Sequence, residues 1–427
     1  MQNLIILASL DLSSPYVMII AASIIIIMSY FFGILSEKTN IPSVLMLILS
    51  GILIKLGLDS AHIEVPDLMP SLEILGIVGL IMIVLEAALD LHLTKDKLPL
   101  IGKSLLISAI ALLGSAFAVA YVIQYFIPME FVKALLYATP LSIMSSAIII
   151  PSVGSLIEEK KEFMIYESTF SDILGIMFFY FIISLMESGG KEAGFQFVSS
   201  FAITIIVAIV ASYGIIFIFK DMKSHSKLFL LIAVLLLLYS AGKLLHLSPL
   251  LIILIFGLAL ANHQLFFKIF KNDLSNEDPI EKIGHEFHLI TLETAFVVRT
   301  FFFVIFGMTI KLASLVNVQV AIISALILLA LYVVRFVALK PFLKSITPEL
   351  WIAPRGLITI LLFFAIPAVH QVEAFDQGIL LYVIIISSLI MTFALIRNKS
   401  VDTHNEEAEE LGDLAAEMGK DANDGGH

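Results

Sequence analysis

The sequence predicts an all-α polytopic membrane protein with about thirteen transmembrane helices. Hydrophobic residues make up 59% of the 427 residues and charged residues 14%, whereas a soluble domain is about half apolar and about a quarter charged. The apolar runs are continuous and about 20 residues long, the length of a spanning helix. Transmembrane β-barrels alternate apolar and polar residues instead. The chain has no cysteine, which excludes disulfides and thiolate metal sites.

A membrane domain is predicted over residues 16–396, between a short N-terminal segment, 1–15, and an acidic tail, 397–427. The spans lie near 16–36, 41–59, 70–91, 103–127, 131–154, 161–186, 195–219, 226–245, 248–267, 287–310, 315–342, 348–370 and 376–396. Residues 401–427 hold nine acids and one base, which favours a solvated cytoplasmic tail over a cation-sensing or partner-binding one.

Orientation follows from the distribution of Lys and Arg, which are enriched in cytoplasmic loops. The loops after odd-numbered spans, with their flanks, contain sixteen such residues, and the loops after even-numbered spans contain five. This bias places the C-terminus in the cytoplasm and, with thirteen spans, the N-terminus outside. We expect a multi-pass protein of the cell (inner) membrane.

Two spans are interrupted by prolines at matching positions. The fifth span contains Pro140 and Pro151, and the twelfth contains Pro354 and Pro367. The two spans are seven apart, so they run in opposite directions and predict inverted repeats with two broken, crossing helices. Paired interruptions of this kind indicate the binding site of a secondary transporter, because freed backbone groups are tolerated only where protein or a hydrated cavity satisfies them. The alternative is two ordinary proline kinks.

Several charged residues fall inside the predicted spans, where each costs about 2.5–3.5 kcal/mol on insertion scales. Pairing is therefore expected. They are Glu167 and Asp172 in the sixth span, Glu293 and Arg299 in the tenth, Arg335 in the eleventh and Arg355 in the twelfth. For Glu293 and Arg299 a structural pairing is favoured.

Glu167 and Asp172 need not form one site, because they point about 140° apart on a helix at about 100° per residue. The simplest division is that Glu167 meets an arginine while Asp172 faces a cavity. A carboxylate among hydroxyl oxygens is a hard site suited to an alkali cation, and a proton can compete for it. The hydroxyls expected near it are those of Thr139, Ser145, Ser146, Ser168 and Ser171. The alternative for Asp172 is a structural ion pair with Arg299 or Arg335.

Residues 167–172, Glu-Ser-Thr-Phe-Ser-Asp, resemble the Glu-Ser-x-x-Asn-Asp signature of the monovalent cation:proton antiporter superfamily. The closer likeness is to bacterial sodium/proton antiporters and animal sodium/proton exchangers, and it covers residues 16–396. Residues 334–336, Val-Arg-Phe, and 353–356, Ala-Pro-Arg-Gly, are similar to two further family motifs. The chain departs from the pattern at Ser171, where the signature has Asn. It also departs at residues 145–147, Ser-Ser-Ala, which are more like the potassium-efflux branch.

The resemblance implies a role for each of these residues. It makes Asp172 the carrier of ion and proton and pairs Glu167 with Arg335. Arg355, Arg299 and Glu293 are expected to be supporting charges. The resemblance also implies a core domain moving against a dimerisation scaffold in a homodimer. By the repeat, the core is about 98–186 and 315–396, and the scaffold is about 16–92 and 195–311.

The expected function is exchange of a monovalent cation for H⁺ by alternating access. The resemblance implies that the exchange is electroneutral, because the family correlates a single aspartate in this motif with electroneutral exchange. Na⁺ is favoured, with Li⁺ or K⁺ open; a K⁺/H⁺ efflux antiporter, or a secondary transporter of another solute, is the alternative. A channel or membrane sensor is the rival of a different class. No cofactor, nucleic acid or nucleotide-binding domain is expected. The sequence shows no histidine metal cluster, nucleophile–base pair or nucleotide loop, so an enzyme is not expected.

Overall fold

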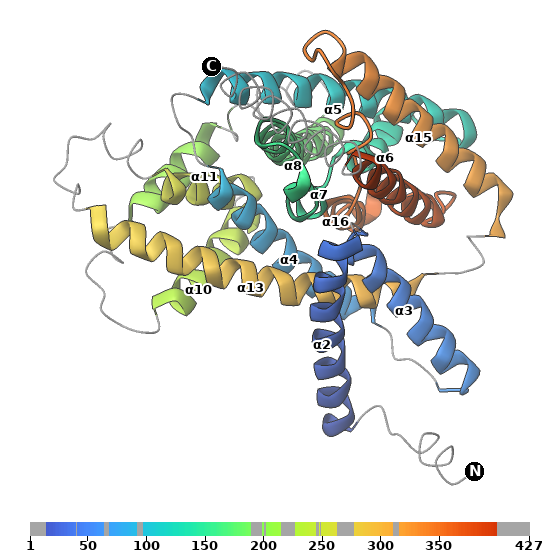
Figure 1. The fold of residues 1–427 in the computed structure, drawn as a ribbon, viewed down its shortest axis with the longest axis horizontal. Coiled ribbons are helices and arrows are strands. Elements are labelled where there is room, and N and C mark those ends of the chain that lie inside the picture. Colours follow the sequence, from blue (N-terminus) through green and yellow to red (C-terminus); the bar gives the residue numbers. More distant parts are fainter. Residues whose placement is uncertain are drawn as a thin grey trace, which may run out of the picture.

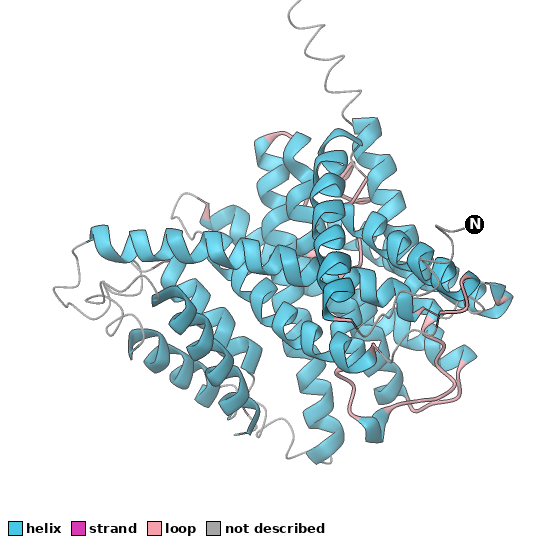
Figure 2. Ribbon diagram, turned by 90° about the horizontal axis from the view of Figure 1, so that it is seen from below, coloured by secondary structure: helices cyan, strands magenta, loops and turns pink. Residues whose placement is uncertain are grey.

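The computed structural model describes residues 14–398, except for 40, 64–67, 92–96, 189–198, 200–201, 215–226, 245–246, 248, 263–276 and 311–315. Most of the predicted N-terminal segment and almost all of the acidic tail lie outside the described residues. The described part of the chain consists of helices and connecting loops, without strands (Figure 2).

Each of the thirteen predicted spans has a helical counterpart. The labelled helices are α2 (Pro15–Thr39), α3 (Ser43–Ser60), α4 (Met69–Asp90), α5 (Leu98–Phe126), α6 (Phe131–Ser142), α7 (Ser146–Ser152), α8 (Glu158–Ser188), α10 (Lys227–Leu244), α11 (Pro249–Ala261), α13 (Glu277–Thr309), α15 (Val318–Leu339) and α16 (Leu357–Phe364). Helices also cover Ala202–Gly214 and Gly378–Asn398. Within the described ranges, nine helical segments are long and apolar enough to cross a membrane. The predicted all-α polytopic fold is confirmed.

The helices pack in two groups. In the first group, α5 packs against α6, α8 and α15, and α16 packs against α6. In the second, α13 packs against α3 and α4, and α11 packs against α4 and α10. Figure 1 shows α6, α7, α8 and α16 in the interior, with α10, α11 and α13 to one side. The two groups meet where α4 contacts α7, α8 and α16.

Two glycines allow an unusually close crossing in the second group. A Cβ on Gly51 of α3 would lie 2.1 Å from the carbonyl oxygen of Val304 on α13, and one on Gly307 would lie 2.3 Å from that of Ile48. Small residues let helix backbones approach in membranes, where dispersion contacts rather than a hydrophobic driving force hold helices together. This contact fixes α3 against α13.

Both proline-containing spans are broken, as predicted. In the fifth span α6 ends at Ser142 and α7 begins at Ser146, with extended backbone at Ile143 and Ser145. The break falls between the prolines, since Pro140 lies inside α6 and Pro151 inside α7. The twelfth span is not helical until Leu357, where α16 begins.

Candidate functional site

The two breaks cross in the interior of the first group. The backbone N–H of Ser145 donates to the carbonyl of Pro354 at 3.0 Å, which joins the breaks directly. The backbone N–H of Arg355 donates to the Ser387 hydroxyl at 3.0 Å. A Cβ on Gly356 would lie 2.6 Å from Ser145 Oγ, so a side chain at Gly356 would not fit this crossing.

Arg355 caps the end of α6. Its Nε donates to the carbonyl of Leu141 at 2.9 Å and its Nη2 to that of Ser142 at 3.3 Å, and its Nη1 also binds the carbonyl of Ala353. The last carbonyls of a helix lack intrahelical donors and carry partial negative charge. The buried guanidinium therefore satisfies the carbonyls that the break leaves open.

Helix α8 receives the amides that the first break frees. The N–H of Met144 donates to Ser171 Oγ at 3.0 Å, and the N–H of Ser146 donates to Asp172 Oδ2 at 3.2 Å. Neighbouring residues of α8 thus accept from Met144 in the break and from Ser146 at the start of α7. Ser171, which departs from the family signature, acts here as a hydrogen-bond acceptor for the backbone.

Asp172 is buried, with 3% of its surface exposed. Its Oδ1 has no hydrogen-bond partner within the described residues, and within the same residues no base forms an ion pair with it. The alternative prediction, an ion pair of Asp172 with Arg299 or Arg335, is wrong. Arg335 contacts Glu167, and Arg299 contacts Glu86. An isolated buried carboxylate is strongly unfavourable unless a proton or a cation neutralises it.

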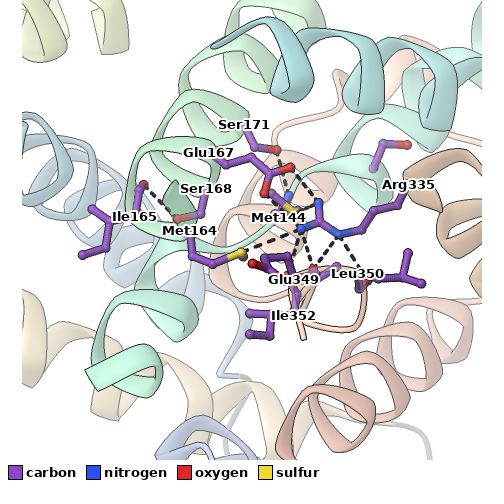
Figure 3. Close-up of polar contacts among 12 residues, drawn as sticks. Met144, Met164, Ile165, Glu167, Ser168, Ser171, Arg335, Glu349, Leu350 and Ile352 are labelled. Carbon is purple, nitrogen blue, oxygen red and sulfur yellow. Dashed lines mark hydrogen bonds and ion pairs between the residues drawn. The ribbon is translucent and has the colours of Figure 1, made fainter. Parts of the chain in front are cut away.

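Glu167 and Arg335 form a closed ion pair (Figure 3). Nη1 and Nη2 of Arg335 lie 2.8 and 3.0 Å from the two carboxylate oxygens of Glu167, whose surface is 0% exposed. The same guanidinium donates to the carbonyls of Glu349, Leu350 and Ile352. The bidentate geometry gives each carboxylate oxygen a charged donor, and the pair joins α8 to α15 and to the non-helical entry of the twelfth span.

The predicted hydroxyls divide into two sets. Ser145, Ser146 and Ser171 lie at the break beside Asp172, and Ser145 Oγ is buried without a hydrogen-bond partner in the described part of the chain. Thr139 and Ser168 instead donate to carbonyls of their own helices, Leu135 and Ile165. Ser146 contacts Asp172 through its side chain, as the sequence predicted, and also through its backbone N–H, which the sequence did not indicate.

The supporting charges of α13 also differ from one another. Arg299 lies 3.5 Å from Glu86 Oε2 on α4, and its Nη1 donates to the carbonyl of Ala147 at 3.2 Å. Glu293 is exposed. Asp90 lies 2.9 Å from His288 in a second contact between α4 and α13. The sequence offered a signal for the Arg299 contact, since Pro151 cannot donate to the carbonyl of Ala147, four residues earlier.

A small cavity is lined by polar and apolar side chains, with Ser171 and Arg335 among them. Its lining includes Ser108 of α5, Ser142, Ser171, Arg335 and Arg355, and it has room for about one water molecule. Ser108 Oγ has no hydrogen-bond partner within the described residues. We expected Asp172 to face a cavity, but Asp172 is not among the lining residues of this one.

An all-helical membrane bundle in which two broken helices cross beside a buried carboxylate is the architecture of a secondary transporter. The sequence model of the family described as "Sodium/hydrogen exchanger, transmembrane" matches residues 23–397. The chain therefore belongs to the sodium/hydrogen exchanger family, as its motifs indicated. This is a family of transporters rather than enzymes, which makes cation/proton antiport the class of activity.

Two solved structures of the sodium proton antiporter MjNhaP1 from Methanocaldococcus jannaschii share the fold. The structure at pH 8 superimposes with a TM-score of 0.68 at 20% identity, covering 90% of this chain and 96% of that one. An electron-microscopy structure gives a TM-score of 0.65 at 17% identity, covering 91% and 96%. No curated protein matches the chain.

Proposed function

We propose that this chain is a secondary active antiporter that exchanges Na⁺ for H⁺ by alternating access at Asp172, one for one. The observation that carries the proposal is the state of Asp172, a buried carboxylate with one oxygen held by a backbone N–H and the other unpartnered within the described residues. Such a group has to be neutralised by a proton or a cation. Because one carboxylate holds one of the two at a time, the two fluxes are coupled.

The oxygen chemistry of the break favours an alkali cation. Asp172 Oδ1 and Ser145 Oγ are both buried and unpartnered within the described residues, and carboxylate and hydroxyl oxygens are hard ligands. A single carrier aspartate neutralised by either Na⁺ or H⁺ returns with the same charge in both directions. Exchange is therefore electroneutral in this proposal.

The packing in two groups supports a moving core and a fixed scaffold. The core comprises about 98–186 and 315–396, with the crossing inside it, and the scaffold comprises about 16–92 and 195–311. The scaffold forms a homodimer in the cell membrane, with the N-terminus outside and the C-terminus in the cytoplasm. Because the chain has no native cysteine, single cysteines placed in successive loops and labelled from one side test this orientation. Mass measurement in detergent tests the dimer.

The experiment is proton flux in proteoliposomes, followed with a pH-sensitive dye while Na⁺, Li⁺ and K⁺ are added in turn. Na⁺ is expected to drive H⁺ movement, and a clamped membrane potential should not change the rate. A response to K⁺ alone would favour the potassium-efflux candidate, to which residues 145–147 are similar. Current without proton movement against a gradient would indicate a channel.

A matched pair of variants assigns the site. Asp172→Asn should abolish cation-driven proton flux, because the amide cannot carry a proton or neutralise a cation. Glu293→Gln makes the same chemical change at an exposed position of α13 and should retain flux. Exchange that survives in Asp172→Asn would remove Asp172 from the mechanism.

A further inference from the structure

Arg299 connects the two groups of helices through one guanidinium. It lies on α13, where its Nη2 contacts Glu86 on α4 at 3.5 Å, within its own group. Its Nη1 reaches across to the carbonyl of Ala147 in α7, at 3.2 Å. The side chains of Arg299 and Glu86 are mostly buried, at 17% and 16% exposure, so solvent screens this contact only in part.

The carbonyl that Arg299 binds needs a donor from outside its helix. The residue four positions after Ala147 is Pro151, which has no N–H to complete the helical hydrogen bond. The residue just before Ala147 is Ser146, whose N–H donates to Asp172 Oδ2. Arg299 therefore binds α7 at Ala147, and the next residue toward the N-terminus, Ser146, is the one that hydrogen-bonds to Asp172 of α8.

Two glycines of α4 pack against apolar side chains of α16 at this boundary. A Cβ on Gly76 of α4 would lie 2.6 Å from the Leu361 side chain of α16, and one on Gly79 would lie 4.0 Å from that of Leu357. Small residues against apolar side chains offer little resistance to sliding. Within α4 and α13, in contrast, the His288–Asp90 contact at 2.9 Å supplements Arg299–Glu86, so these two helices stay together.

We propose that Arg299 is a positioning residue for transport that fastens α7 to the scaffold in this conformation and releases it when the core moves. The inference rests on the proposed exchange at Asp172. When the core moves, Arg299 leaves the carbonyl of Ala147 and remains on Glu86, which keeps its charge paired. The contact thus changes the relative populations of the two access states and leaves ion and proton binding at Asp172 unchanged.

The first test compares apparent KM values for Na⁺ on the two faces of the membrane, in right-side-out and everted vesicles. A change in state population alters the ratio of these two KM values, because each face sees only the fraction of molecules open to it. Arg299→Gln is expected to change this ratio about tenfold, the worth of one charge-assisted hydrogen bond. Arg299→Lys, which keeps a charged donor, should restore part of the change.

Glu86→Gln is expected to change the ratio of the two KM values in the opposite direction from Arg299→Gln. Without the Glu86 carboxylate, Arg299 keeps only the carbonyl of Ala147 as its acceptor. The conformation that contains this contact therefore gains population, which moves the KM ratio the other way. Glu293→Gln, an exposed position on the same helix, should leave the ratio unchanged. Equal shifts on both faces, or the same sign in Arg299→Gln and Glu86→Gln, would overturn the proposal.

The second test does not depend on transport. Hydrogen exchange of the peptide covering residues 143–153 reports local opening of α7. It should quicken in Arg299→Gln and stay at the wild-type rate in Glu293→Gln. Unchanged exchange in Arg299→Gln overturns the proposed contact even if the wild-type chain transports Na⁺, whereas absence of wild-type transport with quickened exchange overturns only the function assigned to Asp172.

Discussion

Glu167 and Asp172 lie five residues apart on α8, and both are buried, yet their surroundings are opposite. Glu167 has both oxygens bound to Arg335, whereas Asp172 has one oxygen on the N–H of Ser146 and the other unpartnered within the described residues. The first carboxylate has a charged donor on each oxygen, so we expect it to be structural. In the function proposed above, the second keeps one oxygen for a proton or a cation. The comparison teaches that a charged partner on both oxygens, rather than burial, separates the structural acid from the carrier that we propose.

The largest expected effect on stability comes from breaking the ion pair between Glu167 and Arg335. Arg335→Met or Glu167→Gln should each lower the free energy of unfolding by about 3–5 kcal/mol, because the remaining partner is left buried and unpaired. The thermal midpoint in detergent measures this. The double variant Glu167→Met/Arg335→Met should recover much of the loss, since no uncompensated charge remains. Wild-type midpoints in both single variants would show that the pair is not structural.

The next effect is stabilisation by the cation. Na⁺ at 100 times its dissociation constant should stabilise the wild-type chain by about 2.7 kcal/mol, through binding to the native state. Asp172→Asn should lose this stabilisation, and it should fold at least as well as the wild type without Na⁺, since an unneutralised buried charge is removed. Glu293→Gln should respond to Na⁺ normally. A Na⁺-dependent midpoint in Asp172→Asn would place the cation elsewhere.

Filling the crossing should have an intermediate effect. Gly356→Ala puts a Cβ 2.6 Å from Ser145 Oγ, and overpacking of this kind costs about 1–3 kcal/mol. Gly102→Ala on α5 is the control, because nothing lies within 4 Å of its added Cβ. We expect a lowered midpoint and slower exchange in Gly356→Ala alone. Equal behaviour of the two variants would mean that the breaks can separate freely.

The smallest effect concerns the hydroxyl beside Asp172. Ser171→Ala removes the acceptor of the Met144 N–H and should lower stability by about 1 kcal/mol. Ser168→Ala removes only a donor to a carbonyl of its own helix and should have a lesser effect. The difference between their thermal midpoints measures how much α8 contributes to holding the first break. A larger loss in Ser168→Ala would reverse that assignment.

The sequence by itself determined the helices, the positions of the two broken spans and the separation of the two carboxylates. These features are local, since apolar run length, proline chemistry and the 100° helical step act over a few residues. The motif at residues 167–172 and the arginine at 335 also pointed to the correct ion pair, through family resemblance. The sequence assigned Thr139 and Ser168 to the site, but their hydroxyls bond to their own helices.

Only the tertiary structure decided which distant groups meet. Arg299 and Glu86 are 213 residues apart in sequence, and Arg299 and Ala147 are 152 apart. Such contacts depend on how whole helices pack, which side-chain periodicity does not encode. Sequence patterns can require that a buried charge or a proline-freed carbonyl find a partner. The identity of that partner comes from packing. Here packing gives both oxygens of Glu167 a partner and leaves one oxygen of Asp172 without a partner within the described residues.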